Sequence, residues 1–131
     1  NMDIELMTSE LLDEVSAQSK TNARLRMNHN FHKSLDDKVH RFLNALEPST
    51  VMDIHRHDED ESYVVLRGAV TALFYDTEGN LMESHTLNPS EGTFGVNIPA
   101  GTYHSLEVLE SNTVLFEVRE GPFKKHIPLG K

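Results

Sequence analysis

The chain has 131 residues, with 21 acidic and 12 basic side chains, a formal net charge of −9 and no cysteine. This length is enough for one domain with a buried core. The negative charge disfavours nucleic acid and anionic membrane surfaces as partners. The lack of cysteine excludes disulfides, iron–sulfur clusters and thiolate zinc sites. No apolar run approaches the ~18 residues of a membrane span, and the acidic N-terminus is unlike a signal peptide, so we expect a cytoplasmic protein.

The first predicted element is a short amphipathic helix over residues 8–20. Thr8 or Ser9 can cap its first turn, and Glu10 favours its positive end. Residues 21–37 are polar and basic without a clear period, which predicts an irregular arm. The apolar stripe of the helix consists of Leu11, Leu12 and Val15.

From Val39 onward, short β-type runs alternate with segments rich in turn residues. About eight such runs with no room for crossover helices predict an antiparallel sandwich or barrel. The runs cover residues 39–46, 51–57, 62–68, 70–76, 81–87, 94–99, 104–110 and 113–119.

The most informative motif is H-x-H-x3-E-x6-G. His55 and His57 lie two positions apart on a strand, so both imidazoles point to the same face. A turn then leads to Glu61, which opens the next strand and can return beside the two histidines. Glu59 is the main rival for this carboxylate, but Glu61 has the spacing to Gly68 that the motif requires.

A second motif, P-x-G-x2-H, places Pro99 and Gly101 in a tight turn and starts the following strand at His104. With these two motifs the chain resembles the cupins, although Ser49 and Val108 replace a glycine and an asparagine that are usual there. The resemblance implies an all-β fold with one jelly-roll barrel, preceded by the short helix and the irregular arm. The predicted metal ligands are His55, His57, Glu61 and His104.

The predicted organisation is one structural domain in three parts. Residues 1–38 form the N-terminal helix and arm, residues 39–123 the barrel, and residues 124–131 a C-terminal tail.

Most of the chain also resembles the WbuC family of cupin-fold metalloproteins, which is named from polysaccharide gene neighbourhoods. The resemblance implies the fold and the metal site but no particular reaction. Members typically end in an acidic tail with tryptophan, whereas this chain ends in KKHIPLGK. The resemblance rests on RLRMNHNFH (24–32), VHRFLNALEPST (39–50), HRH (55–57), VVLRG (64–68), FYDTEGN (74–80), IPAGTYHSL (98–106) and VLFEVREGPF (114–123).

The basic, amide-rich arm is a candidate lid over the barrel mouth, with donors for an anionic or polyhydroxylated ligand. Its alternative role is a structural strap on the barrel. Arg41 and Tyr63 share the apparent parity of inward positions and can either reach the cavity or serve packing. The candidate ligand-binding residues are therefore Arg24, Arg26, Asn30, His32, Arg41 and Tyr63.

Three imidazoles and a carboxylate suit one divalent transition metal, which can be Fe, Mn, Ni, Co or Zn. Three functions fit such a centre. The first is an isomerase or epimerase acting on a sugar, sugar phosphate or nucleotide sugar, the second a non-haem Fe(II) dioxygenase, and the third a non-catalytic ligand-binding module. We expect a homodimer paired through edge strands. We expect His85 and His126 to be exposed.

Overall fold

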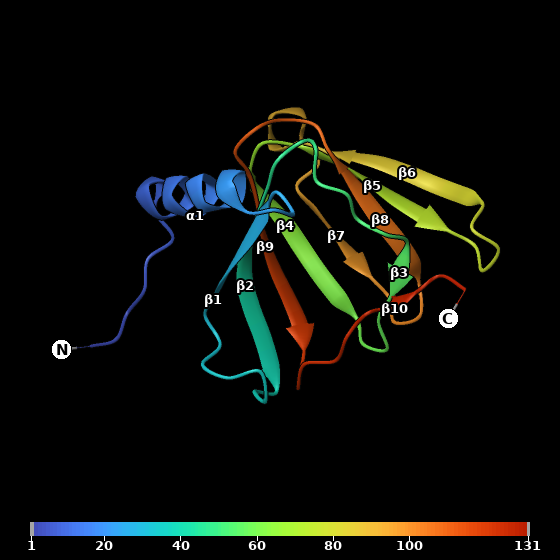
Figure 1. Ribbon diagram of the computed structural model, residues 1–131, viewed down its shortest axis with the longest axis horizontal. Helices are drawn as coiled ribbons and strands as arrows, with labels where there is room; N and C mark the ends of the chain where they lie inside the picture. Colours follow the sequence, from blue (N-terminus) through green and yellow to red (C-terminus); the bar gives the residue numbers. More distant parts are fainter. Residues whose placement is uncertain (1, 131) are drawn as a thin grey trace.

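Two five-stranded antiparallel sheets make up most of the computed structural model, which describes residues 2–130 (Figure 1). Their strand orders are β1-β2-β9-β4-β7 and β10-β3-β8-β5-β6. This arrangement is a jelly-roll barrel, which confirms the all-β prediction. The strands are β1 (Arg26–Asn30), β2 (Val39–Leu46), β3 (His55–Arg56), β4 (Glu61–Arg67), β5 (Val70–Tyr75), β6 (Leu81–Leu87), β7 (Gly95–Ile98), β8 (Tyr103–Val108), β9 (Thr113–Glu120) and β10 (Ile127–Pro128), with a 3-10 turn η1 (Pro89–Glu91) between β6 and β7.

The predicted N-terminal helix is present as α1 (Ser9–Thr21). Thr8 caps it, because its hydroxyl oxygen accepts a hydrogen bond of 3.1 Å from the backbone N–H of Leu11. Leu12 and Val15 are buried against the outer face of the first sheet. Within residues 2–130, no helix has the length and apolar character that crossing a membrane requires.

Two segments outside the predicted strands form short edge strands. β1 pairs with β2 although its composition is polar, and β10 in the predicted tail pairs with β3. An edge strand buries little of its side-chain surface. Backbone hydrogen bonds to the neighbouring strand can therefore hold it in the sheet even when its sequence does not alternate between apolar and polar residues. Conversely, the predicted strand over residues 51–57 is reduced to His55–Arg56.

The main core lies between the two sheets and includes side chains from both. Gly68 connects β4 to β5 with a φ of +85°, and a Cβ there would lie 2.8 Å from Thr113 Cα. The motif glycine is therefore required both by its backbone conformation and by its close contact with β9. The buried core side chains are Leu46, Tyr63, Val65, Val70, Ala72, Leu87, Ile98, Val108 and Leu115.

Candidate metal centre

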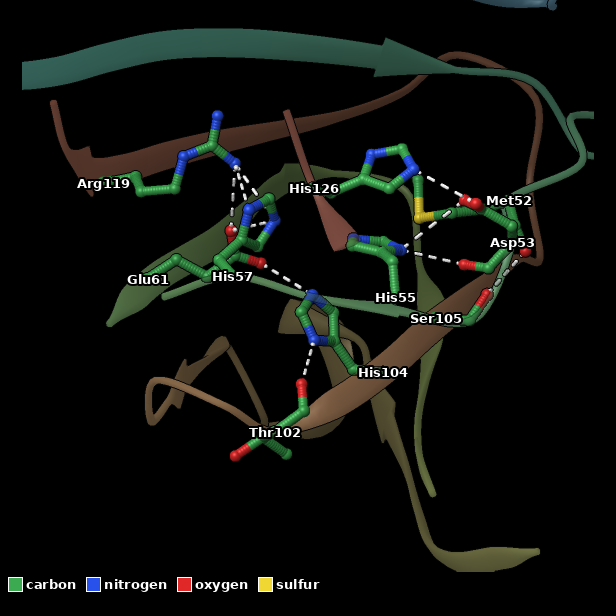
Figure 2. A network of polar contacts seen from close by, with 10 residues as sticks. All are labelled: Met52, Asp53, His55, His57, Glu61, Thr102, His104, Ser105, Arg119 and His126. Atoms are coloured by element: carbon green, nitrogen blue, oxygen red, sulfur yellow. Dashed lines mark hydrogen bonds and ion pairs between the residues drawn. The ribbon is translucent and has the colours of Figure 1, made fainter. Parts of the chain in front are cut away.

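The three predicted histidine ligands meet at one point between the sheets (Figure 2). His55 on β3 and His104 on β8 are direct register partners, and His57 follows β3. Each offers a ring nitrogen, and the three nitrogens lie within 4.8 Å of one another. All three side chains are buried. The spacing inferred from strand parity and the two turns therefore brings these imidazoles together, and the arrangement can hold a metal ion.

Backbone carbonyls fix the orientation of two of the rings. His55 Nδ1 lies 2.8 Å from the carbonyl oxygen of Asp53, and His104 Nδ1 lies 2.8 Å from that of Thr102. A carbonyl oxygen only accepts, so Nδ1 donates in both rings and Nε2 of the neutral ring keeps a free lone pair. His104 Nε2 is buried and points at the Glu61 carboxylate, with Oε1 3.0 Å away. This geometry is the one in which histidine coordinates a metal through Nε2.

Glu61, the first residue of β4, is buried beside the histidines. Its Oε1 lies 3.0 Å from His104 Nε2, and its Oε2 lies 3.3 Å from His57 Nε2. The rival Glu59 does not line the cavity around the histidines, and its Oε2 lies 3.7 Å from Lys124 Nζ. The geometry therefore favours Glu61 over Glu59 as the fourth ligand, and its coordination to a metal stays a prediction.

Burial and the contacts between its charged groups together control the ionisation of this cluster. It lowers the pKa of His55 and of His57 to about 4, so both rings are neutral at pH 7. Burial alone would raise the pKa of Glu61, but the hydrogen-bonding and positive charge of His104, with smaller contributions from His57 and Arg119, lower it to about 2. The same carboxylate raises the pKa of His104 against the effect of burial. A negative group thus lies against the Nε2 atoms of His57 and His104, as a cation site requires.

Two further residues at the centre were not predicted. Arg119 on β9 places Nη1 3.1 Å from His57 Nε2 and 3.4 Å from Glu61 Oε2. The ring of His126 lies 4.5 Å from that of His55 between centroids, and its Nε2 is 3.1 Å from Asp53 Oδ2. His126 is exposed, as is His85, in agreement with the sequence prediction. Its position depends on the pairing of β10 with β3, for which the sequence contains no periodic signal.

The histidines open onto a cavity of about 740 Å³ that Arg24, Arg26 and Tyr63 also line. Three other candidate ligand-binding residues do not line it within the described part of the chain. Asn30 lies at the far end of β1, and His32 stacks on His40 with ring centroids 4.1 Å apart.

Arg41 is the third of these residues. Its side chain was predicted on the inward face of its strand, and this is wrong. Phe42 and Asn44 point into the cavity, so the side chain between them in β2 points to the opposite face. Arg41 borders a separate hollow there with Phe31 and Phe116. Binding of a ligand by any of the six candidates stays a prediction.

Several solved structures share this fold at low sequence identity. CapF of Staphylococcus aureus, a capsular polysaccharide assembling protein, aligns with a TM-score of 0.62 and 18% identity over 80% of this chain and 28% of CapF. Oxalate decarboxylase of Bacillus subtilis aligns with a TM-score of 0.59 and 18% identity over 78% of this chain and 30% of its own. KdgF of a Halomonas species aligns with a TM-score of 0.60 and 17% identity over 79% and 85% of the two chains. The chain thus spans less than a third of the first two proteins and most of the third.

These likenesses establish the fold, which is that of the cupins. No curated protein sequence matches the chain. A family model described as a domain of unknown function, DUF6016, matches residues 7–87. Since the match covers more than half of the chain, the protein belongs to the DUF6016 family.

Proposed function

We propose that this cupin binds one divalent transition metal through His55, His57, Glu61 and His104, and acts as an isomerase or epimerase on a sugar or sugar phosphate. The observation that carries the proposal is the set of buried imidazoles, two of which are held at Nδ1 by carbonyl oxygens, so that Nε2 is directed into the cluster. Nitrogen and oxygen donors suit Fe, Mn, Ni, Co or Zn.

When bound, such a metal polarises a carbonyl group or lowers the pKa of a bound water. The chain itself supplies a group for proton transfer. Glu117 on β9 lines the same cavity, and burial, followed by the charge of Glu61, raises its pKa to about 7. A carboxyl group that gains and loses a proton near neutral pH is suited to moving a proton between substrate atoms, as isomerases and epimerases do.

The comparisons with solved structures support the proposed function, although what they establish is the fold. CapF is described as a capsular polysaccharide assembling protein, and structures of the Bacillus subtilis oxalate decarboxylase are described with Mn(II) centres. The predicted membership of the WbuC family, named from polysaccharide gene neighbourhoods, is part of the same proposal. The two alternatives are a non-haem Fe(II) dioxygenase and a non-catalytic module in which the metal anchors a ligand.

Elemental analysis of the purified protein tests the metal centre. The wild type should carry one ion per chain, and a His57→Ala, His104→Ala double variant should carry almost none. His85→Ala is the matched control, because His85 is exposed and outside the cavity. Full occupancy in the double variant would refute the proposal. Iron, together with oxygen-sensitive absorption, would favour the dioxygenase.

The proposal includes a homodimer in the cytoplasm. The edge strand β6 is exposed along most of its length and presents Leu81 and Met82, which are 54% and 65% exposed. An exposed apolar edge is a surface that a second copy can cover. Light scattering of the purified protein should give twice the mass of the chain, and β6 variants Leu81→Lys and Met82→Lys should give the monomer.

A further inference from the structure

The first sheet contributes a row of polar side chains to the cavity that the metal centre does not use. Asn28 on β1 and Asn44 on β2 are register partners, and Glu117 follows on β9. Side chains alternate between the two faces of a strand, so Leu43, the neighbour of Asn44, packs instead with the α1 residues Leu12 and Val15. This polar row comes from a different sheet from the one that carries His55 and His104.

Asn44 holds an unused acceptor at the centre of this row. Its side chain is buried, and its Nδ2 donates a hydrogen bond of 2.7 Å to Glu117 Oε2. While Glu117 is ionised and can only accept, this bond orients the amide, and Oδ1 remains buried without a hydrogen-bond partner in residues 2–130. Such atoms are rare in native proteins, and the site would be satisfied by a group that donates a hydrogen. A ligand hydroxyl is such a group.

The charge of the cavity differs from that of the rest of the chain. Five of the twelve basic side chains line it, against three of the 21 acidic ones. Within the described residues, Arg24 and Arg26 form no ion pair with a carboxylate at 4 Å or less, so both remain free for a ligand. Unpaired guanidinium groups beside a cavity favour carboxylates and phosphates. The basic residues are Arg24, Arg26, Arg119, Lys124 and Lys125.

We infer that the cavity binds a polyhydroxylated chain with one anionic group. Asn44 and Asn28 contact its hydroxyls, and Arg24 and Arg26 contact its carboxylate or phosphate. The inference rests on the proposed function, because the ligand shares the cavity with the metal. It goes further by assigning the hydroxyls and the anionic group of the ligand to separate residues of the cavity. The volume of about 740 Å³ suits a small metabolite.

Four six-carbon probes separate the two features. Gluconate carries hydroxyls and a carboxylate, sorbitol 6-phosphate carries hydroxyls and a phosphate, sorbitol has only hydroxyls, and hexanoate has only the charge. Titration calorimetry on metal-loaded protein should show that gluconate or sorbitol 6-phosphate binds at least about tenfold more tightly than sorbitol and hexanoate, because each extra hydrogen bond adds to affinity. Which of the two binds more tightly identifies the anion.

Variants then assign the residues. Asn44→Leu should weaken binding of the preferred probe about tenfold and leave hexanoate unchanged, whereas Arg26→Ala should weaken both. Arg41→Ala, on the opposite face of β2, is the matched control and should change neither. If Asn44→Leu does not fold, Asn28→Ala replaces it, because Asn28 is exposed at the cavity rim and its removal leaves the core intact.

Equal affinity for gluconate, sorbitol 6-phosphate and hexanoate, or no binding of any probe, would overturn the inference. An equal effect of Asn44→Leu on the preferred probe and hexanoate would overturn it too.

Metal content, measured on the same samples, separates failure of this inference from failure of the proposed function. Absent metal with an intact Asn44 effect refutes the metal centre alone. Bound metal without an Asn44 effect refutes the polar row alone.

Discussion

Replacing Glu117 by glutamine should make the metal-free protein much more sensitive to acid. As the pH falls from 6.5 toward 4, the unfolded chain protonates its histidines while His55 and His57 stay neutral in the fold, because their pKa is lowered to about 4. The free energy of unfolding therefore decreases with falling pH. Glu117 acts in the opposite direction. Its pKa is raised to about 7, so the folded chain binds a proton that the unfolded chain binds only near 4.5.

The magnitudes follow from the pKa differences, at about 1.4 kcal/mol for each pKa unit. His55 and His57 each account for a loss of about 2–2.5 kcal/mol between pH 7 and 4.5, with solvent screening included. Glu117 offsets about 3 kcal/mol of this loss in the wild type. We therefore expect a net loss of about 2 kcal/mol in the wild type and about 5 kcal/mol in Glu117→Gln.

Glu61 and His104 change the free energy of unfolding mainly outside the range from pH 6.5 to 4.5. The pKa of Glu61 is lowered to about 2, so its stabilising contribution is present above pH 4.5 and is lost only below it. The pKa of His104 is raised, so its contribution is fully present below pH 6.5 and is lost at higher pH. Both directions follow from the linkage between proton binding and folding.

Urea unfolding of the metal-free protein at pH 7, 6, 5 and 4.5 measures this difference. Glu120→Gln is the control, because Glu120 is exposed on the same strand and should leave the wild-type profile unchanged. Glutamine can still accept the hydrogen bond from Asn44, so the variant removes the titration and keeps the contact. A Glu117→Gln profile parallel to that of the wild type would refute the reasoning.

Three further outcomes are expected. Gly92→Ala should lower the free energy of unfolding by about 1–2 kcal/mol because Gly92 has a positive φ. Gly68→Ala should lower it by about 1–3 kcal/mol more, because the added Cβ would also meet Thr113. Equal urea midpoints for the two variants would contradict this. Arg67→Ala removes the ion pair of 2.6 Å to Asp13 and should speed amide exchange in α1, with a stability loss of about 1 kcal/mol. Metal bound at pH 7 should leave during dialysis toward pH 4 as protons displace it, and retention against a chelator at pH 4 would contradict a three-histidine site.

The sequence predicted the barrel and the meeting of the three histidines because both depend on local rules. Strand parity placed His55 and His57 on one face, and the turn at Pro99 and Gly101 started β8 at His104. The same rules favoured Glu61 over Glu59 through its position at the start of β4.

The residues that the sequence missed depend on contacts between distant segments. Asn44 and Glu117 are 73 positions apart, and their hydrogen bond follows from the pairing of β2 with β9. Arg41 was assigned the wrong face because its strand has buried residues on both sides, so that apolar alternation does not determine parity. His126 reaches the centre only through β10, whose two residues are too few for a periodic signal.

The shortness of β10 also affects how fast a ligand can enter. Phe123, Lys124, Lys125 and His126 border the cavity on a segment that follows β9 and ends in this two-residue strand. Pro128 has no backbone N–H, so few hydrogen bonds hold this end of the segment against β3. The segment contributes no side chain to the buried core, so local opening there should occur far more often than global unfolding. We therefore expect the association and dissociation rates of a ligand to depend on the opening of this segment, while the barrel stays closed.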